Sequence, residues 1–390
     1  MAERRDKIPP GVRSEVRKFY GNACVVTGER YTMHHLNGDR TESVFENIIP
    51  LQWELHYQLR RGRDRIRTKD CPGELHPNDL LKRAGVIYGT GNVVRAFGCA
   101  RLAHATRRHF LHKLVEEELL CVRDALYYLR RSSGSKGPAI TTLMRYIMRR
   151  EVIPRLANKA RLATRISLLL AEELASWLNE QGWAKEALPH LVRIDELTKN
   201  PKHCLLNPGE RSRLLRQLAF SQIMCGKASA RIKETLRRAE KATDHPQNRH
   251  GVYNARVMLA LRDRLPVKAW HTLEEQLSEL GVADPWDIDY AHPERSGVRS
   301  PTLLAPLGYM PIVALHDSPK GTPNQHELAE HLVKIETELG QRVALLWDDD
   351  TFRRTLAAGA EEAFLYGHTM VKCGAEDAAL LKEALGYLSV

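Results

Sequence analysis

The sequence lacks the features by which several large classes of protein are recognised. Its 390 residues contain no run of about 18 apolar residues, so we expect no membrane-spanning segment. The opening residues, Met-Ala-Glu-Arg-Arg-Asp-Lys, carry charges with no apolar stretch behind them, so we expect no secretory signal. The glycine-containing stretches at 89–91 and 132–138 lack the spacing of a phosphate-binding loop.

Paired cysteines are also missing. The seven cysteines are odd in number and widely scattered, and no two of them form a Cys-x-x-Cys pair. This pattern disfavours a disulfide scaffold and a four-cysteine zinc site. It predicts reduced thiols and a cytoplasmic location.

Positive charge is abundant and unevenly placed. The chain holds 59 Lys+Arg against 48 Asp+Glu, a formal charge of +11. Residues 1–150 carry +12, residues 151–300 carry +5 and residues 301–390 carry −6. A basic part joined to a less basic remainder is typical of a polyanion-binding segment attached to something else. On charge alone, a solvated helical surface would look the same.

Short, mixed elements are expected in residues 1–75. Strand-like stretches at Cys24–Thr27 and Tyr31–Met33 precede the turn Asn37-Gly38-Asp39, and Ile48–Leu51 is a buried strand-like run. A helix is predicted from Trp53 to about residue 62. The order is strand, loop, strand, helix, which predicts a small N-terminal α+β unit.

Long helices are expected from about residue 78. Asn78 is predicted to cap a helix at Asp79–Val86, and Val94–Tyr128 keeps a nearly continuous helical period. Residues 76–150 are therefore predicted to be a basic helical connector.

A weak repeat is found within residues 151–283. Small and apolar residues recur where packed antiparallel helices need them, with Ala187, Ala230 and Ala269 as markers. The stretch Trp177–Leu188 resembles a tetratricopeptide repeat, and the later units match it poorly. Helical-repeat arrays present a concave surface to a protein partner or ligand, so we expect a sensor or interaction domain here. An unspecialised helical domain is the alternative.

Residues 284–390 are predicted to form a small α/β cap, with strands at 309–315 and 342–347 around a helix at 325–339. The aspartates at 348–350 could bind a metal, but neighbouring strand residues point to opposite faces, which favours a solvated turn. The predicted fold class is mainly α, with the N-terminal α+β unit, the helical-repeat-like region and this cap.

Three histidines carry the most specific chemical signal. His34 and His35 lie at the end of a predicted strand, and the glycine turn lets the chain return. The return strand begins at Asn47, and His56 falls in the first turns of the following helix. These elements can bring three imidazoles to one edge of a small unit. Two neutral imidazoles can bind a divalent metal, and a third can take up a proton near pH 7.

The block at 24–60 resembles the HNH (ββα-metal) nuclease family, whose pattern is a histidine or aspartate, a base histidine, an asparagine and a last histidine in the helix. The resemblance implies a ββα-metal nuclease domain at residues 1–75. In such a domain His35 would be the general base, and His34 and His56 would hold the metal. Asn47 would brace the loop that bears His35. The residues alone leave open which of His34 and His35 is base and which is ligand.

The chain departs from the family pattern at the cysteines. Many members hold a structural zinc with two Cys-x-x-Cys knuckles, whereas here Thr27 stands at the partner position of Cys24. We therefore expect no structural zinc, and hydrophobic packing around Val25, Ile49 and Trp53 in its place.

Arginines follow the last histidine closely. Some family members place a third metal ligand where this chain has Arg60, so the resemblance implies two protein ligands and several waters, which suits Mg²⁺ or Mn²⁺. Arginine side chains suit phosphate oxygens and give affinity without sequence readout. The predicted nucleic-acid-binding residues are Arg60, Arg61, Arg63, Arg65 and Arg67.

The sequence thus predicts a metal-dependent DNA endonuclease of low sequence specificity, regulated by its helical remainder, as in a prokaryotic defence effector against phage. A catalytically inactive nucleic-acid-binding adaptor and an RNA nuclease are the alternatives. Because one HNH site cuts one strand, double-strand cleavage would require two sites and hence a homodimer.

Overall fold

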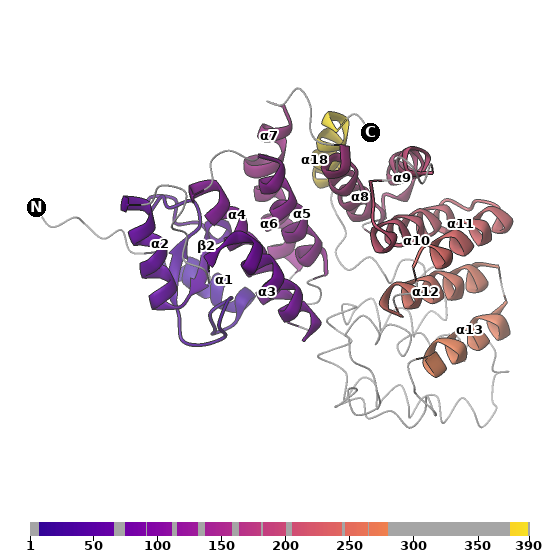
Figure 1. Ribbon diagram of the computed structural model, residues 1–390, viewed down its shortest axis with the longest axis horizontal. Coiled ribbons are helices and arrows are strands. Elements are labelled where there is room, and N and C mark those ends of the chain that lie inside the picture. Colours follow the sequence, from indigo (N-terminus) through magenta and orange to yellow (C-terminus); the bar gives the residue numbers. More distant parts are fainter. Residues whose placement is uncertain are drawn as a thin grey trace, which may run out of the picture. The chain divides into compact units, whose positions relative to one another are not determined.

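The computed structural model shows a mainly helical protein with a small two-stranded sheet. It describes residues 8–65, 75–90, 92–110, 115–131, 137–157, 164–180, 182–199, 205–243, 246–263, 265–279 and 375–388. The chain divides into two compact units, one of residues 1–132 and 138–173, the other of residues 133–137 and 174–390 (Figure 1). The expected boundaries at residues 75 and 150 both fall within the first unit.

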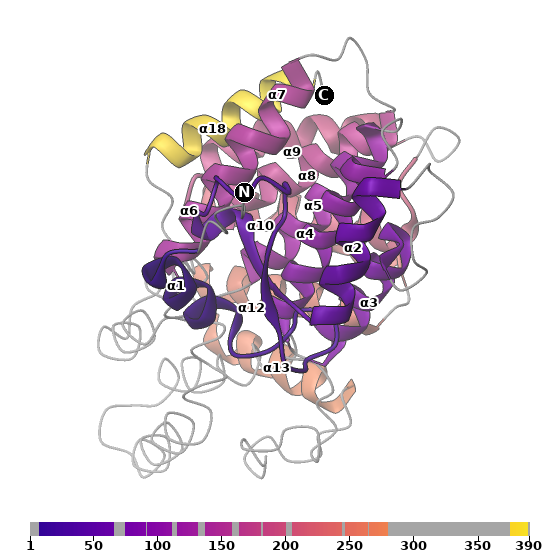
Figure 2. The ribbon, with the colours of Figure 1, turned by 90° about the vertical axis from the view of Figure 1, so that its left-hand side faces the viewer.

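The first unit opens with a helix, a β-hairpin and a second helix, and continues as packed helices. Figure 2 faces the hairpin, with α1 on one side, α2 on the other and α4 behind it. The elements are α1 (Pro10–Tyr20), β1 (Thr32–His35), the 3₁₀ turn η1 (Phe45–Asn47), β2 (Ile48–Leu51), α2 (Trp53–Arg65), α3 (Pro77–Gly89), α4 (Val93–Phe110), α5 (Val115–Arg131), α6 (Gly137–Ile147), the π-helical turn η3 (Met148–Val152), α7 (Ile153–Ala157) and the start of α8 (Thr164–Glu180).

Buried hydrophobic side chains pack the hairpin against its neighbours. All four residues of β2 are buried, and Leu55 and Leu59 of α2, which packs on β1 and α4, are 2% and 4% exposed. From α1, the ring of Phe19 meets Phe45 and Phe97 edge-on, with centroid distances of 5.6 and 6.0 Å. The hairpin is therefore packed against both flanking helices and α4.

The stretch Cys24–Thr27 is a turn, not the strand that its β-branched residues suggested. Its chain reverses through Gly28, whose φ of +82° favours glycine, and the Gly28 amide donates to the Cys24 carbonyl at 2.9 Å. The buried Sγ of Cys24 accepts the amide protons of Thr27 at 3.4 Å and Gln52 at 3.2 Å. These hydrogen bonds tie the turn to the end of β2.

Helix α4 packs directly on this turn. A Cβ added at Gly98 would lie 2.4 Å from Cγ1 of Val25, so only glycine permits this approach. The thiol of Cys99 donates to the Val25 carbonyl at 3.2 Å. The expected packing around Val25 and Ile49 is found, since both are fully buried, but Trp53 is 60% exposed and takes no part in it. Leu55 and Leu59 fill that role, because they lie on the opposite face of α2.

Two helix assignments also differ from expectation. The helical period over Val94–Tyr128 belongs to two helices, α4 and α5, which pack against each other. Helix α3 begins at Pro77, so its N-cap is His76, whose Nδ1 accepts the amide proton of Asn78 at 3.3 Å. Proline supplies a favourable first helical residue and moves the cap two positions before Asn78.

The second unit is a succession of helices. They are the end of α8, α9 (Ala184–Thr198), α10 (Pro208–Met224), α11 (Ser229–Lys241), α12 (Pro246–Arg262), α13 (Pro266–Glu279) and α18 (Ala375–Tyr387). The helices α8, α10 and α12 end alike, with an amide donating to the carbonyl five residues earlier. These bonds are Trp183 to Leu178 at 2.9 Å, Lys227 to Gln222 at 2.9 Å and Leu265 to Ala260 at 2.8 Å.

The marker alanines do not share one position in these helices. Ala187 and Ala269 are each the fourth residue of a second helix and are fully buried. In α11 the fourth residue is Ile232, also fully buried, and Ala230 is exposed. The alanine spacing therefore marks no common position in the helix pairs.

Between residues 280 and 390 the structure describes only 375–388, so the predicted strands of the cap and the aspartates at 348–350 lie outside the described residues. None of the described helices is long and apolar enough to cross a bilayer.

Candidate active site

The hairpin presents the two adjacent histidines on opposite faces of β1. Strands β1 and β2 pair antiparallel, with His34 opposite Ile49 and His35 opposite Ile48. Since successive side chains of a strand point to opposite faces, the two imidazoles have different surroundings.

His34 shares its face with the histidine of α2. The rings of His34 and His56 lie edge to face with centroids 4.8 Å apart, and His34 is 5% exposed. The Thr32 hydroxyl lies 2.8 Å from Nδ1 of His56 and donates its proton to the Leu51 carbonyl at 3.4 Å. With Nδ1 of His56 as the donor to Thr32, Nε2 would carry the lone pair, and that tautomer suits a metal ligand held by an outer hydrogen bond.

His35 is oriented in the same manner on the other face. Its Nε2 lies 3.0 Å from the Ser43 hydroxyl, which donates to the Arg40 carbonyl at 3.2 Å. With Nε2 of His35 as the donor to Ser43, Nδ1 would carry the lone pair. A neutral imidazole in this tautomer can accept a proton at Nδ1.

The loop between the strands is tied together by Asn47, which is fully buried. Its Oδ1 accepts the Asn37 amide proton at 3.0 Å, and its Nδ2 donates to Oδ1 of Asn37 at 2.7 Å and to the Glu42 carbonyl at 2.9 Å. The Leu36 amide donates to the Asn47 carbonyl at 2.8 Å. These hydrogen bonds fix the backbone next to His35.

A tight turn at the loop's tip completes it. Gly38 has a φ of +77°, and its amide donates to the His35 carbonyl at 3.1 Å. The hydroxyl and amide of Thr41 donate to the Asp39 carboxylate at 2.6 and 2.8 Å. These bonds, and above all the one from the Thr41 hydroxyl, hold the pKa of the Asp39 carboxyl below its usual value. The tip of the loop therefore carries a negative charge at neutral pH.

The predicted nucleic-acid-binding arginines are only partly placed. Arg60, Arg61, Arg63 and Arg65 lie in the last turns of α2, after His56, and Arg67 lies outside the described residues. Their role in binding stays a prediction.

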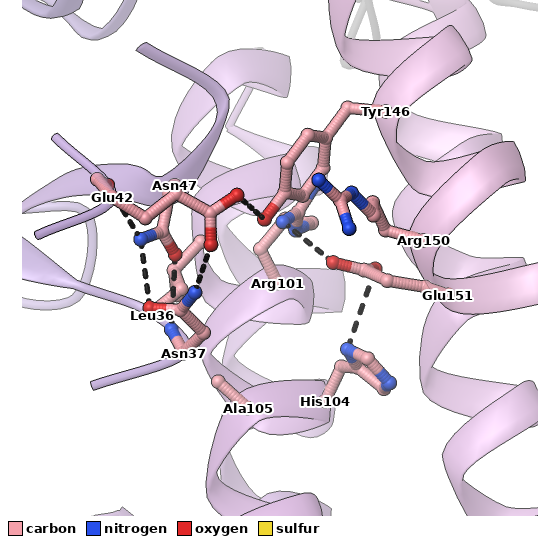
Figure 3. Close-up of a pocket in the computed structure, with 10 residues that line it drawn as sticks. All are labelled: Leu36, Asn37, Glu42, Asn47, Arg101, His104, Ala105, Tyr146, Arg150 and Glu151. Atoms are coloured by element: carbon pink, nitrogen blue, oxygen red, sulfur yellow. Dashed lines mark hydrogen bonds and ion pairs between the residues drawn. The ribbon is translucent and has the colours of Figure 1, made fainter. Parts of the chain in front are cut away.

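A cavity of about 200 Å³ lies behind the loop (Figure 3). Its walls come from the loop, α4, α6 and η3, and Figure 3 shows the side chains of Asn37, Glu42 and Asn47 directed toward one another on one side. The Tyr146 hydroxyl donates to the Glu42 carboxylate at 3.5 Å, and Nδ2 of Asn37 donates to the same carboxylate. Burial, with the nearby Glu42 charge, raises the pKa of Tyr146 to about 12. The loop of His35 is thus linked to α6 by hydrogen bonds.

On the other side of the cavity lies a buried ion pair. Arg101 is 2% exposed and pairs with the Glu151 carboxylate at 2.8 Å. The same guanidinium donates to the Glu46 carbonyl in η1 at 3.4 Å, and its Cζ lies 5.6 Å from the Tyr146 ring centroid. Nδ1 of His104 lies 3.4 Å from the second oxygen of Glu151. These groups support η1, which carries Asn47.

Sequence reasoning did not single out Glu42, Arg101, Tyr146 or Glu151. Only Glu42 lies within the block that resembles the nuclease family, and no spacing pattern connects it to α6. A charged residue in the helical period of α4 and a carboxylate fifty residues later give no local signal that they pair.

No family model matches the chain, and neither the curated proteins nor the solved structures searched contain a match to it.

Proposed function

We propose that the chain is a metal-dependent endonuclease of the HNH type, which hydrolyses DNA phosphodiester bonds with low sequence specificity. The observation that carries this proposal is the ring contact between His34 and His56 on one face of β1, with His35 next in the chain and Asn47 tying its loop. The order of strand, turn, strand and helix predicts that His34 and His56 meet, and their ring contact supports the proposal.

The protein's own groups divide the reaction between them. His35 accepts a proton from the attacking water at Nδ1, while Ser43 holds the ring through Nε2. Asn47 keeps the backbone of the loop in one conformation, so that this nitrogen is already placed when substrate binds. The arginines after His56 would bind phosphates on either side of the cleaved bond.

The proposed metal would have two imidazole ligands from the protein and water in its other positions. In the described parts of the chain, no group of three or more histidine, cysteine or carboxylate side chains is arranged to hold an ion, so His34 and His56 would be joined by waters. Such a shell suits Mg²⁺ or Mn²⁺. When bound, the metal would supply Lewis-acid stabilisation of the charge that develops on the phosphate and the leaving oxygen.

Incubation of supercoiled plasmid with the full chain and Mg²⁺ or Mn²⁺ tests the proposal. We expect nicking that EDTA abolishes and that falls by about 10²- to 10⁴-fold in His35→Ala, because a positioned general base contributes that much. His271→Ala is the matched control, since this exposed histidine lies on α13 in the second unit. Equal cleavage by His35→Ala and wild type would contradict the assignment. Binding of plasmid without cleavage under either metal would favour the adaptor.

The second unit would regulate the nuclease by binding a protein partner or ligand. A nuclease with little sequence specificity endangers its own DNA, so restraint within the same chain is expected. This division suits a cytoplasmic defence effector in a prokaryote. The test is to compare plasmid nicking by the full chain with that by a fragment that ends after residue 180: restraint predicts faster nicking by the fragment.

A further inference from the structure

Two aromatic side chains flank His56 on the surface of α2. Trp53 and Tyr57 are 60% and 46% exposed, although both are large and largely apolar. They lie four residues apart, on one face of the helix, and the Trp53 ring centroid is 6.0 Å from that of His56. Helix α2 lies at one edge of the first unit, beside the hairpin (Figure 1).

The core does not require these rings. Leu55 and Leu59 on the opposite face of α2 are 2% and 4% exposed and already pack the helix against the hairpin. A pair of adjacent exposed aromatic rings beside a candidate site is more often a binding surface than a chance exposure of single residues.

The positive charge that follows these two rings in the sequence indicates what kind of partner they bind. The sequence places five arginines between residues 60 and 67, directly after the two rings; Arg60, Arg61, Arg63 and Arg65 belong to α2, and Arg67 lies outside the described residues. Flat π-faces next to concentrated positive charge are the combination that binds single-stranded nucleic acid, where bases stack on aromatic rings and phosphates meet cations. In a duplex the faces of the bases are covered by their neighbours, so an indole can stack only on an unpaired base.

We propose that Trp53 and Tyr57 form a stacking platform for unpaired nucleobases, and that the preferred substrate therefore has a locally single-stranded segment. The inference rests on the proposed function only in placing this platform beside the bond to be cleaved. Trp53 and Tyr57 are specificity-determining residues and not catalytic ones.

Binding is measured with the full chain carrying His35→Ala, using a 20-nucleotide oligo(dT) and a paired duplex of equal length. We expect Trp53→Ala to raise the Kd for oligo(dT) by about 10-fold, because one stacked base is lost, and to change the duplex Kd less than twofold. The dependence of Kd on salt should keep its slope, because no phosphate contact is removed. Trp53→Phe should restore most of the affinity.

Val86→Ala is the matched control, because this apolar side chain is 69% exposed on α3 and should leave both affinities unchanged. Thermal unfolding of Trp53→Ala and Trp53→Phe shows whether the variants keep the wild-type fold. Because the chain has six tryptophans, the fluorescence of Trp53 is obtained as the difference between wild type and Trp53→Phe. Quenching of that difference signal by oligo(dT) would support stacking.

Equal loss of affinity for both probes, or no loss for either, would overturn the platform. So would self-association of the wild type in light scattering that Trp53→Ala abolishes, since the rings would then form an interface between copies of the chain.

Cleavage of a duplex with an unpaired bubble separates this inference from the proposed function. If the wild type and Trp53→Ala cut the bubble equally well, the stacking platform is contradicted and the proposed nuclease activity is supported. If the wild type cuts nothing but binds oligo(dT) through Trp53, the nuclease fails and the platform stands.

Discussion

The ion pairs compared here are more deeply buried in the first unit of the protein than in the second. In the first unit, Arg130 and Glu173 form an ion pair that is 0% exposed on both sides, and Arg101 and Glu151 form one at 2% and 8%. In the second unit, Arg237 and Glu234 are each 52% exposed, and Arg249 and Glu279 are 40% and 31% exposed. At these pairs the first unit pays the larger desolvation cost, although Arg238 and Asp195 in the second unit form a pair that is only 26% and 7% exposed.

This difference bears on the candidate site. A buried charge tolerates few arrangements, because any movement that separates it from its partner leaves it without solvent or counter-charge. Arg101 and Glu151 border the cavity next to Asn47, so the groups that hold the loop are among the least tolerant of change in the described chain. Exposed pairs in the second unit allow small shifts between helices at little cost.

The strongest test of this comparison is truncation. A fragment that ends after residue 150 loses Glu151, Arg155 and Glu173, which pair with Arg101, Glu118 and Arg130. The free-energy cost of leaving several buried charges without partners would exceed the free energy of unfolding of a typical domain. We therefore expect this fragment to show no cooperative unfolding transition and no plasmid cleavage. A fragment that ends after residue 180 keeps these pairs and should unfold cooperatively. Circular dichroism during thermal unfolding distinguishes the two. A folded 1–150 fragment would show that the pairs matter little.

A single substitution should reproduce part of this effect. Arg130→Met leaves the Glu173 carboxylate buried without its bidentate partner, so the free energy of unfolding should fall by about 3–5 kcal/mol. Arg237→Met is the matched change in the second unit and should not shift the denaturation midpoint measurably, because its pair is exposed. Urea denaturation measures both. Equal effects of the two substitutions would remove the proposed contrast.

The contact between His34 and His56 was predictable for a physical reason, whereas the expected third imidazole, His35, points to the other face of β1. His34, Asn47 and His56 lie within 23 residues, on short elements whose order is set by local turn and strand preferences. The Asn37-Gly38 turn appears as expected, with a positive φ at Gly38. The contact between His34 and His56 then follows from the hairpin and the first turns of α2.

Other features depend on partners far along the chain. Nothing near Glu151 indicates that it pairs with an arginine fifty residues earlier, or that a π-helical turn carries it. The exposure of Trp53 depends on the helical phase of α2: Leu55, two residues on, is buried, so the indole lies on the opposite, exposed face. The prediction that Trp53 packs in the core rested on its residue type alone and was wrong.

A smaller, more local effect is expected at Asn47. Asn47→Ala removes three hydrogen bonds and leaves the part-buried Asn37 amide without its acceptor, which should lower the free energy of unfolding by about 1–3 kcal/mol. Cleavage should fall further than stability explains, since His35 loses its fixed backbone. Asn207→Ala, at the capping box of α10 in the second unit, should cost about 1 kcal/mol and leave cleavage unchanged. Unaltered nicking by Asn47→Ala under conditions where the protein is folded would contradict the bracing role.

The mildest test needs no substitution. Burial raises the pKa of Cys99 and of Cys121 in the first unit to about 12, so both thiols stay protonated up to well above pH 9. Cys225, in the second unit, is only half-buried, although burial raises its pKa as well. With iodoacetamide at pH 8.5, peptide mapping should show Cys225 alkylated many times faster than Cys99 or Cys121.

The same pKa shifts predict how stability depends on pH. Because a raised thiol pKa stabilises the fold only while the thiol is protonated, the stability that Cys99 and Cys121 contribute should disappear as the pH rises from about 9 toward 12. Alkylation of Cys99 and Cys225 at equal rates below that range would mean that the first unit opens as readily as the second, and its buried charges would then not be rigid supports for the loop.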